Sequence, residues 1–413
     1  MKPEDKLSYK NIIKRCPDFE GVISKLAWEN IGDTNKKTRG YLSKLWANNI
    51  EENIKNKLWK KHGSVRKDCV GLGKNKALIG VGAGQSFNKN KDILKQVADT
   101  DGTRDWEKRN FVIAASNHMY KPLLKMGIIP DFVSLVDGSD VVMKQLNEDI
   151  PECGKNTILL TGLHCSPKVL KEWSKQGREI RFYMPVSEGM REVFEKYTNK
   201  QAQHHEILQG GNVLNTLFSI GLRFLHTTTF MALGNDLSYP LKDKIEDQRT
   251  NYYADLDYTS NQKGTGTGRD EANARKKWLG FTLHPHLIYT GNNNDRYNIN
   301  LDIVGTSHTL WVYKTWIEAN VLLNAKGKVS YHYYNCSEGG IAGVMNKDMK
   351  LRKAELQKDE TWYLMDDICP RWHTRMFKDA VEEFVKAKEA MVWPARGIGL
   401  DALNAGDSVA ARI

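Results

Sequence analysis

The stretch that decides the fold is Ala77-Leu78-Ile79-Gly80-Val81-Gly82-Ala83-Gly84-Gln85-Ser86, a short apolar run that breaks into closely spaced glycines. The apolar run predicts a buried strand, the glycines predict a tight turn, and residues 88–98 predict a helix. The amino end of a helix after such a turn presents backbone N–H groups to an anion. Glycine there permits positive φ and a close approach of phosphate to the backbone. The spacing is neither the G-x-G-x-x-G dinucleotide fingerprint nor a P-loop, so a plain glycine-rich turn stays an alternative.

The composition is ordinary for a soluble globular protein, with 413 residues of which 40% are hydrophobic and 27% charged. No apolar run reaches the roughly 18 residues that span a bilayer, and the start lacks the apolar segment of a secretory signal. We therefore expect a cytoplasmic protein without a membrane span. The six cysteines are scattered, which indicates free thiols instead of a disulfide framework or a Cys/His metal site.

The chain is basic. It has 61 lysines and arginines against 50 acidic residues, a net charge of +11 and a pI near 9.1. This balance favours partners that carry phosphate, such as a nucleotide sugar, nucleic acid or an anionic surface, without separating them.

From residue 76 onward, apolar β-rich runs alternate with helical segments. The predicted strands lie at 110–115, 132–136, 157–161, 180–184 and 227–233. Nearly all-apolar strands that alternate with helices predict a parallel sheet covered on both faces. We therefore expect an α/β fold, a doubly wound, Rossmann-like and mostly parallel sheet with helical N- and C-terminal extensions.

Three parts are expected along the chain: a basic helical region at 1–75, a nucleotide-binding core at 76–345, and a C-terminal helical extension and tail at 346–413. In the first part, an apolar stripe at four-residue spacing predicts a packed helix, formed by Leu42, Trp46, Ile50 and Ile54. Lysines and arginines then crowd positions 55–67. They form either a nucleic-acid or acceptor surface or a solvated helix end. The core contains an irregular insertion at about 240–298, with a glycine-rich segment at 264–269, which we interpret as a flexible lid.

Ligands of doubly wound sheets bind outside the carboxyl ends of the strands. Polar groups converge at these predicted ends: Gly82–Ser86, Ser116-Asn117, Asp137, Gly162–His164 and Gly234–Asp236. The helix that opens at Gly210-Gly211-Asn212 should face the same crevice. For Asp137 and Asp236, capping of a helix or a turn is the structural alternative.

In this order the motifs resemble the family of motility accessory factors and of the archaeal 6-hydroxymethylpterin diphosphokinase, the MptE-like family. Its nucleotide-binding core is similar to that of one class of bacterial sialyltransferases. The four matching motifs are Gly82-Ala83-Gly84-Gln85-Ser86-Phe87, Pro130-Asp131 with Asp137, Gly210-Gly211-Asn212-Val213 and Gly234-Asn235-Asp236-Leu237. The resemblance covers about residues 76–345. Three positions depart from the family pattern, because Gln85 replaces proline, Asn212 replaces serine and Asn235 replaces glutamine.

The resemblance implies one of two activities. The motility factors resemble glycosyltransferases that move a nonulosonic acid from a CMP donor to a flagellin hydroxyl. The archaeal enzymes transfer diphosphate from ATP to a pterin alcohol and need magnesium. A Gly305-Thr306 turn, a helix over 307–324 and an Asn335–Gly340 loop follow the core here, as in the motility factors. The family comparison therefore favours a glycosyltransferase with a nucleotide-sugar donor, CMP-type favoured, and a hydroxyl acceptor that is a protein, a small molecule or a nucleic acid.

The resemblance also suggests roles for the strand-end residues. The donor phosphate would be held by Gly82, Gly84, Gln85, Ser86, Gly210, Gly211 and Asn212, with Asn117 and Asn235 as further nucleotide contacts. Asp236 and His164 are the predicted bases, with a bonded structural histidine as the alternative for His164, and Asp137 would hold the ribose or a cation. Magnesium is expected if the donor is a nucleoside diphosphate sugar or ATP. The alternatives are the diphosphokinase, with Asp137 and Asp236 as magnesium ligands, and a basic nucleic-acid-binding or DNA-modifying protein.

Overall fold

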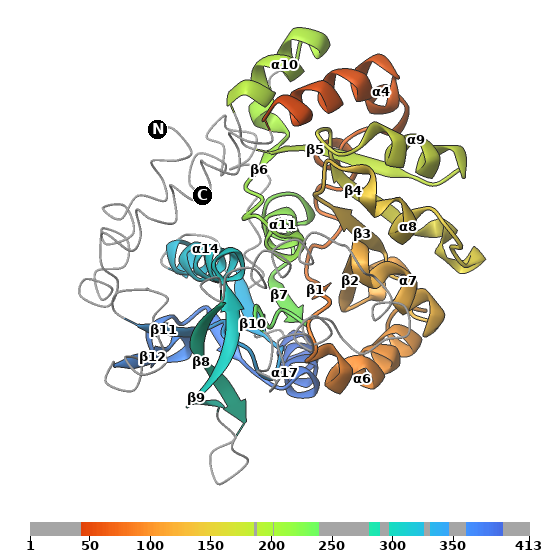
Figure 1. Cartoon of the computed structure of the whole chain (residues 1–413). Helices are drawn as coiled ribbons and strands as arrows, with labels where there is room; N and C mark the ends of the chain where they lie inside the picture. Colours follow the sequence, from red (N-terminus) through yellow and green to blue (C-terminus); the bar gives the residue numbers. More distant parts are fainter. Residues whose placement is uncertain are drawn as a thin grey trace.

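The computed structural model describes residues 43–185, 188–200, 202–238, 281–289, 297–325, 331–346 and 361–390. Its centre is a nine-stranded parallel sheet with the order β13-β10-β7-β1-β2-β3-β4-β5-β6 (Figure 1). The strands are β1 (Ala77–Val81), β2 (Phe111–Ser116), β3 (Phe132–Leu135), β4 (Ile158–Gly162), β5 (Ile180–Pro185), β6 (Glu206–Ile207), β7 (Thr229–Leu233), β10 (His332–Asn335) and β13 (Trp372–Thr374). The predicted doubly wound α/β fold is confirmed.

The topology switches direction beside β1. The chain steps outward from β1 to β6 and then returns through α11 (Val213–Ile220) to β7, on the other side of β1. Ala77 is in parallel register with Phe111 of β2 and with Thr229 of β7. In doubly wound sheets such a reversal marks the usual ligand position, which here corresponds to the carboxyl ends of β1 and β7.

Helices cover both faces of the sheet. Side chains of α6 (Phe87–Thr100), α7 (Asn117–Lys125) and α17 (Phe377–Glu389) share a buried cluster with Ala77, Ile79 and Val81 of β1. On the opposite face, α11 and α14 (His308–Ala325) share a cluster with Leu78. Because both faces are covered, every position of β1 is buried, and the strand reads as a continuous apolar run.

Shorter helices and a separate two-stranded sheet, β11-β12, account for most of the other described elements. They are α4 (Leu58–His62), α5 (Val65–Asp68), η2 (Trp106–Lys108), η3 (Asp140–Val142), α8 (Met143–Leu146), η4 (Glu152–Asn156), α9 (Pro167–Lys175), α10 (Glu188–Thr198), η5 (Ala202–His204), η6 (Gly221–Leu225), β11 (Val344–Asn346), β12 (Trp362–Leu364) and α16 (Met365–Ile368).

The N-terminal helices pack against the sheet. Ile50 is fully buried, and Trp46 and Ile54 pack on the same cluster, together with residues of β3, β4 and β5. The predicted apolar stripe is therefore confirmed for these three positions, while Leu42 lies outside the described residues. Ser64 forms a parallel bridge with Phe182 of β5, so residues 43–68 are layered directly onto the strands. The domain boundaries stay predictions.

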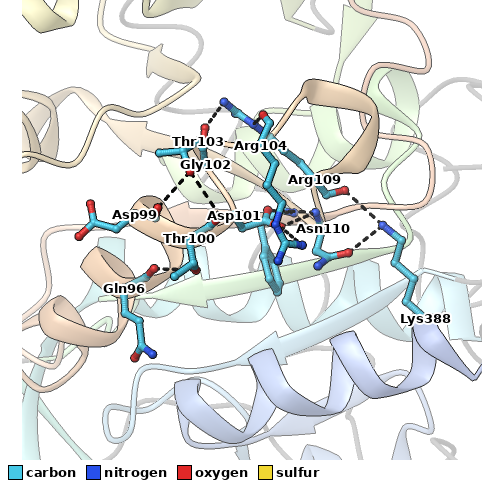
Figure 2. Close-up of polar contacts among 11 residues, drawn as sticks. Gln96, Asp99, Thr100, Asp101, Gly102, Thr103, Arg104, Arg109, Asn110 and Lys388 are labelled. Atoms are coloured by element: carbon cyan, nitrogen blue, oxygen red, sulfur yellow. Dashed lines mark hydrogen bonds and ion pairs between the residues drawn. The ribbon is translucent and has the colours of Figure 1, made fainter.

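The C-terminal segment is tied to the amino edge of the sheet. Lys388 of α17 donates hydrogen bonds to the Arg109 carbonyl (3.2 Å) and to Asn110 Oδ1 (2.9 Å) (Figure 2). Asp101, just after α6, accepts the N–H groups of Asn110 and Phe111, each at 2.9 Å. The segment predicted as a helical extension contains the expected helix, α17, and also a strand of the central sheet, β13.

The region after β7 differs from the prediction. β8 (Phe281–Tyr289) pairs antiparallel with β9 (Tyr297–Ser307), so residues 281–289 of the predicted irregular insertion form a strand. Gly305-Thr306 lies inside β9 and is not a turn, because Thr306 pairs with Thr282. The hydrogen-bond partner that extends β9 comes from another segment, which local sequence does not reveal. Residues 239–280, with the predicted lid and the glycine-rich segment 264–269, lie outside the described residues.

The cysteines and the helix lengths test two further expectations. The five described cysteines, Cys69, Cys153, Cys165, Cys336 and Cys369, are free thiols as predicted. Cys16 lies outside the described residues. In the part of the chain that the structure describes, no helix has the length and apolarity needed to cross a bilayer.

Candidate functional site

The glycine turn after β1 packs against the turn after β7. Gly82 N donates to the Leu233 carbonyl (2.8 Å), and Gly84 N donates to the Gly234 carbonyl (2.9 Å). A Cβ on Gly82 or Gly84 would lie 2.5 Å or 2.7 Å from the Gly234 oxygen. Gly234 has φ of 60°, and its own Cβ would lie 2.4 Å from the Gly82 oxygen. Glycine is therefore required here for the contact between two turns, whereas the sequence suggested contact with a phosphate.

Asp236 occupies the amino end of α6. Its Oδ2 accepts Ser86 N (2.9 Å), and its Oδ1 accepts the Ser86 hydroxyl. Burial raises the pKa of Asp236 to about 6, although the Ser86 hydrogen bonds oppose this rise. The protein's own carboxylate thus takes a backbone N–H group that would otherwise face an anion at the start of α6.

The two glycines before α11 serve the packing of α14. Gly210 and Gly211 have φ of 60° and 85°, which favours glycine. A Cβ on Gly210 would lie 2.5 Å from the Trp316 ring, and one on Gly211 would lie 2.3 Å from the Tyr313 ring. Both rings belong to α14, so the backbone of this turn and α14 fix each other's position.

The amino end of α11 reaches the surface next to β1. Asn212 caps the helix, because its Oδ1 accepts Asn215 N at 2.7 Å. Gly211 is exposed, and Asn212 and Val213 are partly exposed. One turn on, Leu214 packs so closely against β1 that a Cβ on Gly82 would lie 2.7 Å from it. The first N–H groups of a helix have no partner within it, so α11 presents donors and a positive dipole end at the switch point.

Two serine hydroxyls lie in the adjacent strands. Ser116 of β2 and Ser134 of β3 are register partners, and strand alternation directs both toward the face that α11 covers. Both hydroxyl oxygens are buried, and neither has a hydrogen-bond partner among the residues that the structure describes. Unpaired buried polar groups are rare and are typical of ligand or water positions. Gln209, just before α11 and partly exposed, donates from Nε2 to the Tyr183 hydroxyl at 3.1 Å.

His164 is enclosed at the end of β4. Its side chain is fully buried, its Nε2 donates to the Val136 carbonyl (3.1 Å), and the Trp46 ring packs edge-on at 5.3 Å. Burial lowers the pKa of His164 to about 4, so the imidazole is neutral. Asn49 of the helical residues 43–55 donates to both the Gly138 and His164 carbonyls, each at 2.9 Å. This helix therefore covers the ends of β3 and β4.

The other predicted residues divide into buried and accessible ones. Asn117 is buried and donates to Gln145 Oε1. Asn235 is buried too and donates from Nδ2 to the Tyr333 hydroxyl at 3.1 Å. By contrast, Gln85 is partly exposed, and Asp137 is exposed with one carboxylate oxygen accepting Ser139 N at 2.8 Å.

All the predicted site residues thus follow carboxyl strand ends or precede α11, on the expected edge of the sheet. Those accessible to a ligand are Gln85, Gly210, Gly211, Asn212 and Asp137, whereas Ser86, Asn117, His164, Asn235 and Asp236 are held in the interior. Sequence reasoning placed Ser116 at the ligand edge without assigning it a role, and it did not single out Ser134 or Gln209. The available signal was a serine near the carboxyl end of an otherwise apolar strand. Within the described ranges, no group of three or more His, Cys, Asp or Glu side chains is arranged to hold a metal ion.

Residues 46–242 match the protein-family model described as 6-hydroxymethylpterin diphosphokinase MptE-like. This region resembles the MptE-like family. The predicted resemblance is confirmed, and the MptE-like region contains β1 to β7 and α11, hence the whole switch point. It also includes Trp46 and Asn49, which lie before the predicted start of the core.

A solved structure, the MAf glycosyltransferase from Magnetospirillum magneticum AMB-1, aligns with a TM-score of 0.43 and 12% identity. The alignment covers 83% of this chain and 42% of that protein, so this chain spans less than half of that protein's length. No curated protein sequence matches this chain.

Proposed function

We propose that the chain is a glycosyltransferase that moves a sugar from a nucleotide donor to a hydroxyl acceptor, with the donor phosphate at the amino end of α11. The observation that carries this proposal is the contrast between the two helix starts at the switch point. Asp236 takes the Ser86 N–H at the start of α6, whereas Gly211 and Asn212 leave the start of α11 open to solvent.

The open helix start suits the leaving group of such a reaction. As the sugar departs, negative charge grows on the donor phosphate, and oriented N–H groups at a helix start stabilise it. Ser116 and Ser134 supply two unpaired hydroxyls for the nucleoside beside α11. The two predicted bases, Asp236 and His164, are buried, whereas Asp137, predicted to hold the ribose or a cation, is exposed. We therefore assign to Asp137 the role of accepting the proton of the acceptor hydroxyl.

The family model's name makes a diphosphokinase the second candidate. That reaction would use ATP and magnesium, with Asp137 and Asp236 as predicted ligands. The Asp236 carboxylate accepts both the N–H and the hydroxyl of Ser86, so it does not fit direct magnesium binding while these bonds persist. This observation favours sugar transfer.

Asn212→Asp tests the phosphate position. Aspartate caps a helix as well as asparagine does, so the fold is retained, but the new negative charge repels the donor phosphate. We expect nucleotide affinity to fall at least about tenfold, since like charges in contact cost several kcal/mol. Asn212→Ser keeps a neutral cap and is the matched control. Isothermal titration with CMP, UDP and ATP, with and without magnesium, measures the effect.

The same titration separates the two functions. Binding of CMP or UDP that Asn212→Asp weakens and Asn212→Ser preserves supports the transferase. Tightest binding of ATP with magnesium, or equal affinity in the two variants, contradicts it.

A further inference from the structure

A basic face lies on α4, α5 and the loop after α10, away from the proposed donor site. Its exposed side chains are those of Lys57, Lys60, Arg66, Lys67 and Lys200. Across the described residues, none of these five forms an ion pair. They differ in this from the surface lysines that carry an acidic partner three or four residues away, such as Lys108 with Asp105.

Ring contacts between α4 and α10 hold two parts of this face together. Trp59 of α4 packs edge-on against Phe194 of α10 with centroids 5.2 Å apart, and α4 and α10 lie side by side at the top of Figure 1. At one end, the ammonium groups of Lys55 and Lys196 lie 5.7 and 5.3 Å from the Tyr197 ring.

At the other end, cations from three segments share one region. Arg66 and Arg223 both help to lower the pKa of His204, after burial as the main cause. Burial followed by Arg66 and Lys200 likewise lowers the pKa of His205 to about 4. Arg66 and Lys200 therefore both lie near His205, although they are far apart in sequence.

Several acidic side chains around this face are already paired. Glu206 accepts both Nε (2.9 Å) and Nη2 (2.7 Å) of Arg191. Glu51 pairs with Lys55, and Glu52 pairs with Lys171. The five unpaired cations thus remain in excess, and an external anion with several charges could neutralise them together.

We propose that this basic face binds the phosphate backbone of a nucleic acid. Separate cations along a surface match a chain of phosphates, and binding then gains from counterion release. An anionic membrane is a poorer fit, because surface-bound helices bury apolar side chains in the lipid. The large apolar side chains exposed among the described residues are Leu45, Val70, Ile129 and Val141, and none belongs to α4, α5 or α10. The inference does not depend on the proposed donor site.

The test is fluorescence anisotropy of the full chain with a labelled duplex of about 20 base pairs, between 50 and 200 mM salt. The triple variant Lys60→Gln, Arg66→Gln, Lys67→Gln should lose at least about tenfold in affinity at the lower salt. Its slope of log affinity against log salt should be shallower by about 2 to 3, since each phosphate contact contributes about 0.9. The control triple, Lys108→Gln, Lys155→Gln, Lys386→Gln, removes the same charge from paired lysines elsewhere.

Retained affinity in the control together with loss in the first triple supports the proposal. Equal losses in both triples would show a net-charge effect and overturn it. Failure of the native chain to bind duplex at the lower salt would overturn it too, as would tighter binding to phosphatidylserine vesicles than to duplex. Circular dichroism checks that both triples are folded, and Lys57→Gln with Lys200→Gln gives an independent variant of the same face.

Discussion

Asp236 illustrates how a residue that looks catalytic in sequence can have a structural role. It follows a strand at the ligand edge, as catalytic carboxylates often do. Its partner, however, is Ser86, 150 positions earlier in the chain. The carboxylate links the turn after β7 to the start of α6, and whether it also takes part in catalysis stays a prediction.

The pH dependence of stability tests this role through Asp236→Asn. Burial raises the pKa of Asp236 from 3.8 to about 6 in the folded state. The folded protein therefore holds this proton more tightly than the unfolded chain. The contribution of the carboxyl to the free energy of unfolding is largest below pH 3.8 and is lost as pH rises through about 6. Two pKa units correspond to roughly 3 kcal/mol.

Asparagine at 236 has no such titration, yet it can still accept Ser86 N. Relative to the native chain, Asp236→Asn should gain about 2 to 3 kcal/mol of unfolding free energy between pH 4.5 and 7.5. Urea denaturation of both proteins across this range measures the difference. A difference that does not change with pH would show that the buried carboxyl does not titrate as described.

At the level of elements, the switch point is built from two turns that need glycine because they contact each other. Gly234 combines φ of 60° with a Cβ position 2.4 Å from the Gly82 oxygen. Gly177 has φ of 75°, but no atom of the described residues lies within 4 Å of its Cβ position. Comparing substitutions at these two glycines therefore separates the free-energy cost of a strained backbone from the cost of steric overlap.

We expect Gly234→Ala to lower the free energy of unfolding by about 2 to 5 kcal/mol, from the left-handed backbone and the steric overlap together. Gly177→Ala should lose only about 1 to 2 kcal/mol, from the backbone alone. Urea midpoints with unchanged m-values give the comparison. Equal losses would mean that the turn contact at β1 and β7 relaxes at little cost.

At the scale of the whole molecule, the helical residues 43–55 cover the carboxyl ends of β3 and β4. Asn53 is fully buried, and its Nδ2 donates to the Leu163 (2.8 Å) and Cys165 (2.9 Å) carbonyls. With Asn49 one turn earlier, it joins residues 43–55 to the ends of β3 and β4. The helix and the strands should therefore unfold together.

Asn53→Ala should lower the free energy of unfolding of the whole protein by about 2 to 4 kcal/mol, because two buried carbonyls lose their donor. Asn56→Ala, at an exposed position three residues on, should stay within about 0.5 kcal/mol of the native value. Chemical denaturation followed by tryptophan fluorescence checks both. A separate early transition in Asn53→Ala, with the main midpoint unchanged, would show that residues 43–68 fold as their own unit.

The sequence by itself determined the parallel sheet, since buried strands such as Ala77–Val81 are apolar at nearly every position and glycines mark their ends. It also determined which edge collects the polar residues, because all parallel strands end on the same side. Only the tertiary structure decided which of those residues face solvent. Asp236 is hydrogen-bonded to Ser86, 150 residues away, and Asn235 is hydrogen-bonded to Tyr333, 98 residues away. The ring of Trp46 packs on His164. Local sequence specifies backbone conformation and burial pattern, but pairing between distant side chains depends on how the layers pack.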